Sequence, residues 1–262
     1  MKKIKRIVIK IGTSTIANSV DGLPNFERMK SIVSVLAGIK KSGVEVVVVT
    51  SGAIGIGSGK LGFLNKEKNI SQKQACASVG QCALINLYDE LFANFGFLVS
   101  QVLLTQQVID GGENEFNAKN TFRVLLKHGV VPVVNANDTV STSELNFGDN
   151  DSLSAVVASL IEADILIILT DTDGIFNKNP CDCSNVSLIS KISHIDSTIR
   201  EIVKGKPGAL GTGGMETKLK AAEFLSLQKI PVAIVNGRNP ERIEGIFKGS
   251  LKGTVIDLAG VF

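Results

Sequence analysis

The chain has 262 residues, and 44% of them are hydrophobic, which is enough for one large core or for two lobes that share a sheet. Lysine and arginine total 28 against 25 aspartates and glutamates, and this net charge of +3 is too mild to indicate nucleic-acid binding. No apolar run reaches the ~20 residues that span a bilayer, and Lys10 and Gly12 interrupt the run that follows the basic N-terminus. We therefore expect a soluble, cytoplasmic protein that binds neither nucleic acid nor membrane.

Apolar runs alternate with amphipathic helical patterns along the chain. In chain order we expect a strand at 4–11, a helix at 25–42, a strand at 44–50, a helix at 71–94, a strand at 97–105, a helix at 117–128, a strand at 130–135, a helix at 151–162, a strand at 164–170, a helix at 215–228, a strand at 231–236, a helix at 240–248 and a strand at 253–257. This alternation predicts an α/β fold, a three-layer αβα sandwich with a mostly parallel central sheet. A short hairpin is expected at 177–192. Because no linker divides the chain, we expect one domain, 1–262, with two functional halves at about 1–165 and 166–262.

Three glycines precede one expected helix, in the segment Gly211-Thr212-Gly213-Gly214-Met215-Glu216-Thr217-Lys218. Glycines let backbone N–H groups approach an anion, and a helix N-terminus adds its positive dipole end, so this loop is suited to phosphate. The Walker A pattern G-x-x-x-x-G-K-[ST] does not occur in the chain. The sequence therefore predicts phosphate binding by another architecture.

Polar residues and glycines follow the expected strands, at the edge of the sheet where open α/β folds bind ligands. They are Lys10, Gly12, Thr13 and Ser14; Thr50, Ser51, Gly52 and Ala53; Asn135, Asn137 and Asp138; Thr170, Asp171, Asp173 and Gly174; and Asn236 and Gly237. Their regular placement predicts a ligand site along this edge.

Lys10 lies inside an apolar strand, where a cation is costly to bury without an anion, although a lysine near a strand end can also extend to solvent. The glycine and hydroxyl residues after it favour a lysine that faces phosphate. Lys10 and Lys218 would flank a phosphoryl group in transfer, a reaction that depends on positioned positive charge. Asp151, which opens an expected helix, would hold both lysines in addition to any helix capping. Asn150 and Asp138 would bind an ammonium group or other polar donors of a substrate.

Two other features indicate little chemistry. Gly57-Ser58-Gly59-Lys60-Leu61-Gly62 fits the dinucleotide pattern G-x-G-x-x-G, but it neither follows its strand directly nor has an acidic residue about 20 positions later, so we expect a flexible loop over a small ligand. Among the four cysteines, Cys76 and Cys82 fit a helical pattern and are expected in the core. Cys181 and Cys183 are expected in an ordinary loop, the alternative being a metal clip with His194.

The motifs together resemble the amino acid kinase family, and within it the members that phosphorylate glutamate, from about residue 7 to the C-terminus. Each segment is weak evidence alone, and their common order is what makes the resemblance specific. The segments are Val8-Ile9-Lys10-Ile11-Gly12-Thr13-Ser14, Val49-Thr50-Ser51-Gly52-Ala53-Ile54, Asn135-Ala136-Asn137-Asp138-Thr139-Val140, Phe147-Gly148-Asp149-Asn150-Asp151-Ser152-Leu153-Ser154-Ala155, Leu169-Thr170-Asp171-Thr172-Asp173-Gly174 and the glycine-rich loop that ends at Lys218.

This resemblance implies ATP-dependent phosphorylation of the side-chain carboxylate of L-glutamate to γ-glutamyl phosphate, the first step of proline biosynthesis. It implies that the half 1–165 binds glutamate through Ser51, Gly52, Ala53, Asn135, Asp138 and Asn150. It implies that ATP, bound mainly by the half 166–262, contacts Lys10, Gly12, Thr170, Asp171, Thr212, Gly213, Gly214, Met215, Glu216, Thr217 and Lys218. Lys10, Lys218 and Asp151 would be the catalytic residues. Mg²⁺ would be held mainly by the nucleotide phosphates, so no protein ligand to a metal is expected.

The chain departs from the family pattern in two respects. Ala136 stands where a glutamate is common, and we expect a small change in site geometry rather than loss of activity. The chain ends at Phe262 without the C-terminal RNA-binding-type domain of many members, which leaves catalysis intact but regulation and subunit number open. The family further implies a homo-oligomer, feedback inhibition by proline near the segment 56–70, and a downstream glutamyl phosphate reductase as a possible partner.

Three alternatives remain open from the sequence. The chain could be another kinase of the same fold, acting on acetylglutamate, aspartate, carbamate or a nucleoside monophosphate. It could also be a non-catalytic nucleotide-binding protein, against which both lysines and Asp151 speak. An RNA-binding module is the third alternative, and the mild charge disfavours it.

Overall fold

A computed structural model describes residues 3–16, 23–64, 66–108, 111–140, 150–178, 186–204 and 214–262. Across these residues one sheet has eight strands in the order β3-β4-β2-β1-β5-β7-β8-β6. The strands are β1 (Arg6–Ile11), β2 (Glu45–Thr50), β3 (Val99–Leu104), β4 (Val131–Ala136), β5 (Ile165–Thr170), β6 (Lys191–Ile192), β7 (Val232–Asn236) and β8 (Thr254–Ile256). All pairings are parallel except that of β7 with β8. The expected mostly parallel sheet is confirmed.

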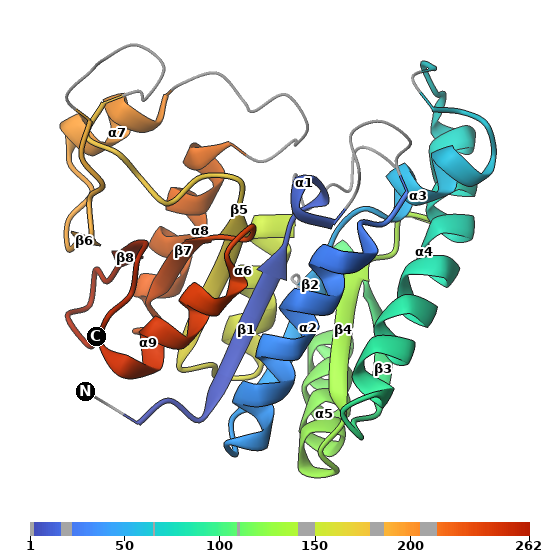
Figure 1. Cartoon of the computed structure of the whole chain (residues 1–262), viewed down its shortest axis with the longest axis horizontal. Helices are drawn as coiled ribbons and strands as arrows, with labels where there is room; N and C mark the ends of the chain where they lie inside the picture. Colours follow the sequence, from blue (N-terminus) through green and yellow to red (C-terminus); the bar gives the residue numbers. More distant parts are fainter. Residues whose placement is uncertain are drawn as a thin grey trace.

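Helices cover both faces of the sheet (Figure 1). They are α1 (Thr13–Ile16), α2 (Phe26–Lys41), α3 (Ala53–Lys60), α4 (Ile70–Ala93), α5 (Glu113–Lys127), α6 (Asn150–Leu160), α7 (Ser197–Val203), α8 (Met215–Ser226) and α9 (Glu244–Lys248), with short 3₁₀ turns η1 (Gln106–Val108) and η3 (Pro240–Ile243). The buried apolar residues form two clusters, one on each face. One cluster joins the sheet to α5, α6 and α8, and the other joins it to α2, α3, α4 and α9. These layers confirm the predicted αβα sandwich.

The strand β1 shows how the sequence builds these layers. Its side chains alternate between the two faces, so Val8 packs in the cluster with α6 and α8, whereas Ile7 and Ile9 pack in the cluster with α2 and α4. Because β1 pairs with β2 on one side and β5 on the other, it is buried on both faces and both edges. Lys10 comes two residues after Val8, so its side chain lies on the same face of the sheet, the face that α6 and α8 cover.

The expected flexible loop at 57–62 is wrong, because Ala53–Lys60 forms α3. Gly57 of α3 and Gly80 of α4 serve helix packing: a Cβ on Gly57 would lie 1.8 Å from the Cys76 carbonyl oxygen, and one on Gly80 would lie 1.7 Å from that of Ala53. The glycines thus let α3 and α4 approach each other at backbone distance, which the sequence pattern alone did not indicate.

Other expectations had mixed outcomes. Cys76 is buried as expected, but Cys82 is exposed, because it lies on the solvent side of α4. Cys181 and Cys183 lie outside the described residues. The hairpin expected at 177–192 begins with an antiparallel bridge between Phe176 and Leu188, but its last residues form β6, which pairs in parallel with β8.

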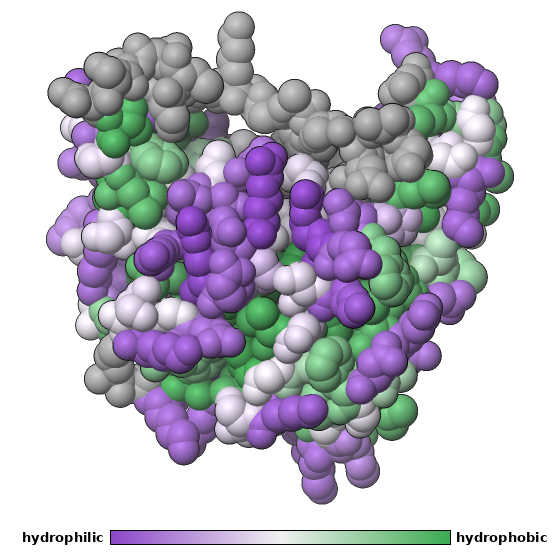
Figure 2. Space-filling view, viewed as in Figure 1, coloured by the Kyte–Doolittle hydropathy of each residue, from purple (hydrophilic) through white to green (hydrophobic). Residues whose placement is uncertain are grey.

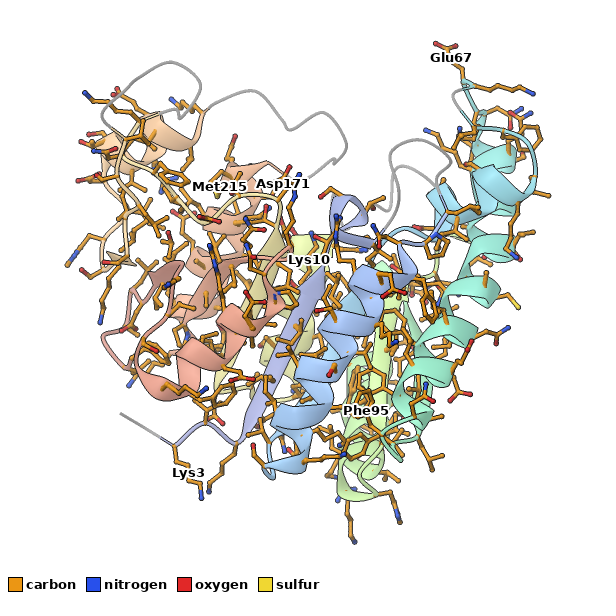
Figure 3. The ribbon with its side chains drawn as sticks, viewed as in Figure 1. Lys3, Lys10, Glu67, Phe95, Asp171 and Met215 are labelled. Atoms are coloured by element: carbon orange, nitrogen blue, oxygen red, sulfur yellow. The ribbon has the colours of Figure 1, made fainter. Side chains whose placement is uncertain are left out.

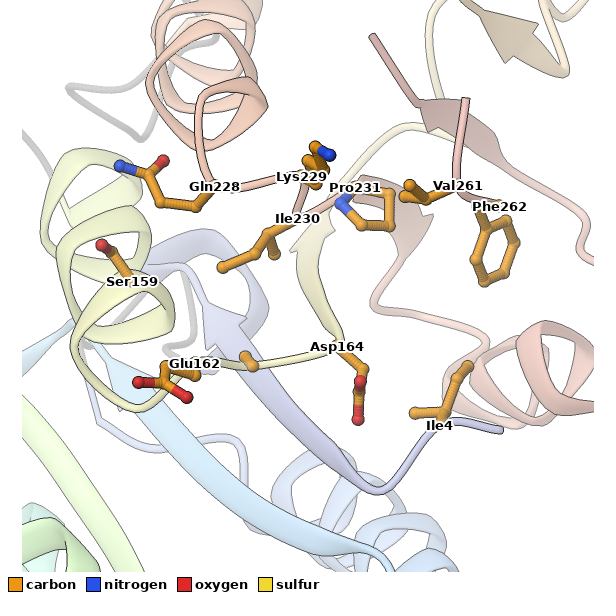
Figure 4. A pocket seen from close by; sticks show the side chains of 11 residues that line it. Ile4, Ser159, Glu162, Asp164, Gln228, Lys229, Ile230, Pro231, Val261 and Phe262 are labelled. Atoms are coloured by element: carbon orange, nitrogen blue, oxygen red, sulfur yellow. The ribbon is translucent and has the colours of Figure 1, made fainter. Parts of the chain in front are cut away.

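A cavity of about 510 Å³ opens at the amino ends of β5 and β7 (Figure 4). Asp164 and Pro231, which directly precede these strands, contribute to its lining together with Ile4 and the end of α6. This position is opposite to the carboxyl ends of the strands, so the cavity is separate from the edge where the sequence predicts a ligand site. Within the described part of the chain, no helix is both long and apolar enough to cross a membrane.

Candidate active site

The carboxyl ends of β1, β2, β4 and β5 lie along one edge of the sheet because these strands run parallel to one another. Hydrophilic side chains gather on the molecular surface near this edge (Figure 2). Lys10 of β1, Asp171 just after β5 and Met215 of α8 lie near the same end of the sheet (Figure 3). The topology therefore brings the predicted site residues from both halves of the chain into one region.

Three charged side chains meet in the interior at this edge. The Lys10 Nζ atom lies 2.8 Å from Asp151 Oδ1, and the Lys218 Nζ atom lies 3.0 Å from Asp151 Oδ2. Asp151 is fully buried, and the two lysines are 7% and 4% exposed. The sheet and two helices create this contact: Lys10 is the next-to-last residue of β1, Asp151 lies in the first turn of α6, and Lys218 lies in the first turn of α8. Residues far apart in sequence thus form one buried cluster of two cations and one anion.

The two lysines decide the charge state of Asp151. Burial alone would raise the pKa of its carboxyl group, but the ammonium groups of Lys10 and Lys218, with the Thr217 hydroxyl, hold this pKa below its ordinary value. The Thr217 Oγ1 atom lies 2.7 Å from Asp151 Oδ2 and donates to it. A carboxylate is therefore maintained in a site from which water is excluded, where its attraction for both lysines is strong.

The first turn of α8 contains the end of the predicted phosphate loop. Gly214 precedes the helix, and Met215, Glu216, Thr217 and Lys218 are its first four residues. Thr212 and Gly213 lie outside the described residues. Because the first N–H groups of a helix have no partner within it, this turn presents backbone donors next to the Lys218 ammonium group.

The other nucleotide-site predictions lie around the same cluster. A Cβ on Gly12 would come within 3.5 Å of the Lys10 Nζ atom, so this glycine keeps the space beside the ammonium group open. Thr170 ends β5, and its hydroxyl lies 3.2 Å from Asp171 Oδ1, to which it donates. The structure thus brings Gly12 next to Lys10, and Thr170 with Asp171 to the end of the neighbouring strand.

The predicted substrate residues form a second polar group at the same edge. The Asn150 side-chain nitrogen donates to the Thr50 carbonyl at 2.8 Å, and it lies 2.7 Å from Ser51 Oγ and 3.2 Å from Asn135 Oδ1. Asn150 directly precedes Asp151 in α6, so the polar group adjoins the charged cluster. Asn150 therefore contacts both Ser51 and Asn135 directly.

Gly52 and Ala53 connect this polar group to α3. Gly52 has φ +96°, in the left-handed region that favours glycine, and this conformation turns the chain from β2 into the helix. Ala53 is the first residue of α3, so its backbone N–H belongs to the unpaired donors of a helix start. The segment after β2 can therefore present backbone donors beside Ser51.

Asp138 lies in the turn after β4 and is half-buried. Burial raises the pKa of its carboxyl group above the ordinary value for aspartate. A bound ammonium group would offset the desolvation of this carboxylate, which suits the predicted role in binding a substrate amine.

Sequence reasoning missed Gln81, a buried residue of α4 whose Oε1 atom accepts a hydrogen bond from Asn135 Nδ2 at 2.9 Å. The signal was present in the helical pattern. Gln81 shares one face of α4 with the buried residues Ala77, Leu84 and Tyr88, so it is a polar residue on an otherwise apolar stripe.

A sequence model described as the amino acid kinase family matches residues 5–236. The chain belongs to this family. Its relatives include proteins named glutamate 5-kinase from Clostridium acetobutylicum, 42% identical over 97% of this chain and 95% of the relative, and from Clostridium perfringens, 42% identical over 97% and 96%. Among solved structures, the isopentenyl phosphate kinase of T. acidophilum superposes with a TM-score of 0.68 over 96% of this chain and all of that one, at 24% identity. That likeness shows the family fold alone.

Proposed function

We propose that this chain transfers the γ-phosphoryl group of ATP to the side-chain carboxylate of L-glutamate and forms γ-glutamyl phosphate, the first step of proline biosynthesis. The observation that carries the chemistry is the convergence of Lys10 and Lys218 on the buried carboxylate of Asp151. The choice of glutamate rests on the relatives named glutamate 5-kinase that match nearly the whole chain.

We assign charge stabilisation to the two lysines. Phosphoryl transfer needs little covalent help from the protein, and catalysis comes mainly from positioning and from positive charge placed where negative charge develops. Each ammonium group has three N–H donors, so a contact with Asp151 leaves donors for phosphoryl oxygens. Asp151 keeps both lysines close to each other despite their mutual repulsion. The attacking group is the substrate carboxylate, so no protein nucleophile is required.

We assign glutamate binding to the polar group beside this cluster. Asp138 would hold the substrate ammonium group, while Ser51, Asn135 and Asn150 supply hydroxyl and amide groups, and Gly52 and Ala53 supply backbone donors. In this assignment the glutamate side chain would extend toward Asp151 and the lysines, because Asn150 and Asp151 are adjacent in α6.

We assign ATP binding to Lys10, Gly12, Thr170, Asp171 and the start of α8, with Thr212 and Gly213 before it. The helix start would receive phosphate oxygens on its free N–H groups. Among the described residues no cluster of three or more histidines, cysteines or acidic side chains could hold a metal, and both oxygens of Asp151 already face lysines. This donor set fits Mg²⁺ that is carried by the nucleotide phosphates, where the ion would neutralise charge on their oxygens.

Three further parts of the proposal rest on the family alone: a homo-oligomer, inhibition by proline at the glutamate site, and delivery of the product to a glutamyl phosphate reductase. A fourth, the cytoplasmic location, rests on the hydropathy of the sequence. All four stay predictions.

ADP release measured with a panel of acceptors tests the proposed function. We expect L-glutamate to stimulate release, and acetylglutamate, aspartate, carbamate and UMP to leave it near background. If another acceptor stimulated ADP release and L-glutamate did not, that acceptor would be the substrate in place of glutamate.

The same assay tests the lysines. Lys218→Met should lower kcat about 100- to 1,000-fold, the usual effect of removing one transition-state donor. Lys248→Met is the matched control, because Lys248 is an exposed helix lysine that pairs with Glu244 and should leave kcat unchanged. Equal kcat values for the two variants would remove Lys218 from the mechanism.

A further inference from the structure

Gln81 links the helix α4 to the predicted substrate site. Its Oε1 atom accepts a hydrogen bond from Asn135 Nδ2 at 2.9 Å, and both side chains are buried, at 7% and 2% exposure. Asn135 has the parity of Val131 and Val133 in β4, and these two pack in the cluster that contains α4, so the side chain points toward this helix.

The backbone of α4 is held firmly at this position. Gly80, next to Gln81, has no side chain, and a Cβ there would lie 1.7 Å from the Ala53 carbonyl oxygen and 2.7 Å from the Gly57 nitrogen. The helix therefore lies directly against the first turn of α3, which follows Ser51 and Gly52. This contact fixes how far Gln81 reaches toward Asn135.

The Asn135 amide is oriented from both ends. Its Oδ1 atom accepts from the Ala136 N–H at 2.9 Å and lies 3.2 Å from Asn150 Nδ2. Gln81 holds the opposite end, the amide nitrogen. An asparagine amide has two N–H donors, so this contact uses one and directs the other. Asn135 in turn contacts Asn150, which contacts Ser51, so the orientation is passed along the predicted glutamate site.

The other end of the Gln81 amide argues against a purely structural role. Among the described residues, the buried Gln81 Nε2 atom has no hydrogen-bond partner. An unsatisfied buried donor costs about 1–3 kcal/mol, and an apolar side chain of the same size would avoid this cost. Methionine would, however, leave the Asn135 Nδ2 donor without its acceptor, so glutamine gives no clear net gain in stability at this position.

We propose that Gln81 is a positioning residue for the phosphate acceptor: it orients the Asn135 amide and thereby sets the geometry in which Asn135 and Asn150 bind glutamate. This inference rests on the proposed function of the site. We expect Gln81 to affect binding of the acceptor and to leave binding of ATP unaffected. Gln81 lies on the sheet face that α4 covers, whereas the lysine cluster lies on the opposite sheet face, which α6 and α8 cover.

Gln81→Met tests the proposal, since methionine fills the volume without an acceptor oxygen. We expect KM for glutamate to rise about 5- to 30-fold, the equivalent of one lost buried hydrogen bond, with KM for ATP unchanged. The melting temperature should change little, because the variant loses the unpaired Gln81 donor but leaves the Asn135 donor without its acceptor. Gln81→Glu keeps an acceptor oxygen in either protonation state and should restore most of the affinity for glutamate. Gln101→Met, an exposed glutamine of β3, is the control for the substitution itself.

A double-mutant cycle with Asn135→Ala shows whether Gln81 acts through Asn135. If it does, Gln81→Met adds nothing to KM once the Asn135 amide is gone, because residues that act through one contact are not additive. An unchanged KM for glutamate in Gln81→Met, or an undiminished rise in the Asn135→Ala background, would overturn the proposal. KM is measured for whichever acceptor of the panel the wild type phosphorylates, so a wrong choice of glutamate is distinguished from a wrong role for Gln81.

Discussion

At the scale of single residues, the site depends on one buried carboxylate between two buried ammonium groups. Asp151→Asn keeps the size of the side chain but leaves Lys10 and Lys218 without a counter-charge. Removing one partner of a buried ion pair typically costs about 3–5 kcal/mol, so we expect a loss of this order in the free energy of unfolding at pH 7. Urea unfolding of the variant and the wild type measures it.

The pH dependence of this loss has a definite sign. The folded pKa of Asp151 lies below its unfolded value, so ionised Asp151 stabilises the fold above the unfolded pKa, and this contribution disappears as pH falls through the folded pKa. The gap between wild type and Asp151→Asn should therefore narrow as the solution is acidified. A gap that is absent at pH 7, or that widens toward acid, would contradict the assigned ion pairs.

Asp138 should behave in the opposite way. Burial raises its pKa in the folded protein, so ionised Asp138 destabilises the fold, fully at pH values above the folded pKa and not at all below the unfolded pKa. Asp138→Asn should raise the melting temperature at neutral pH while it raises KM for glutamate, because the ammonium group loses its partner. Thermal unfolding and KM are measured on the same preparation. A variant with lower stability and unchanged KM would show that Asp138 is structural.

At the scale of elements, the crossing of α3 and α4 fixes one wall of the substrate site. Gly80→Ala would place a methyl group 1.7 Å from the Ala53 carbonyl oxygen, and a backbone atom cannot move aside without shifting the helix. We expect a loss of at least about 1–3 kcal/mol in the free energy of unfolding, the usual cost of overpacking. KM for glutamate should rise as well, since Ala53 and Gln81 are displaced together.

Gly38→Ala is the matched control for this substitution. Gly38 lies within α2, and a Cβ there meets nothing within 4 Å, so alanine should stabilise the helix by about 0.4–1 kcal/mol. If Gly80→Ala were as harmless as Gly38→Ala, the close helix contact would be wrong.

The elements also show what the sequence could predict. Strands such as β1 were recognisable as short apolar runs, and helices such as α2 were recognisable because their apolar residues recur at helical spacing. The helix α3 was not, since its three glycines have poor helical propensity and its stability comes from contact with α4. The seven-residue α7 was also missed, although Asp196 caps it by accepting from the Ile199 N–H at 2.8 Å.

The site could be predicted only in part for a related reason. The order of strands places loop residues at one edge, and Lys10 was conspicuous as a cation in an apolar strand. Asp151 was expected to hold both lysines, and both contacts are present. Which other atoms meet is a tertiary property, and no local pattern indicates that Gln81 reaches Asn135. A buried polar residue on an apolar helix face, such as Gln81, is the signal that a sequence can offer, and its partner appears only with the fold.

At the scale of the whole molecule, the two predicted halves, about 1–165 and 166–262, should unfold together. The strand β1 pairs with β2 from the first half and with β5 at the boundary, and the core cluster under α5, α6 and α8 contains residues of both halves, such as Val47 and Leu219. Neither half can therefore lose its structure without exposing apolar surface of the other, which favours a single cooperative transition.

Two spectroscopic signals test whether the halves unfold together. The chain has no tryptophan and one tyrosine, Tyr88, which is buried in α4 and hydrogen-bonded to Thr50, so its fluorescence reports on the first half. Far-ultraviolet circular dichroism reports on all helices. We expect the two signals to give the same urea midpoint, and an ATP analogue to shift both equally, since a ligand of the folded state stabilises every part that unfolds with its site. A fluorescence transition that separates from the dichroism transition, or that ignores the nucleotide, would mean that the halves are independent folding units joined only at the sheet.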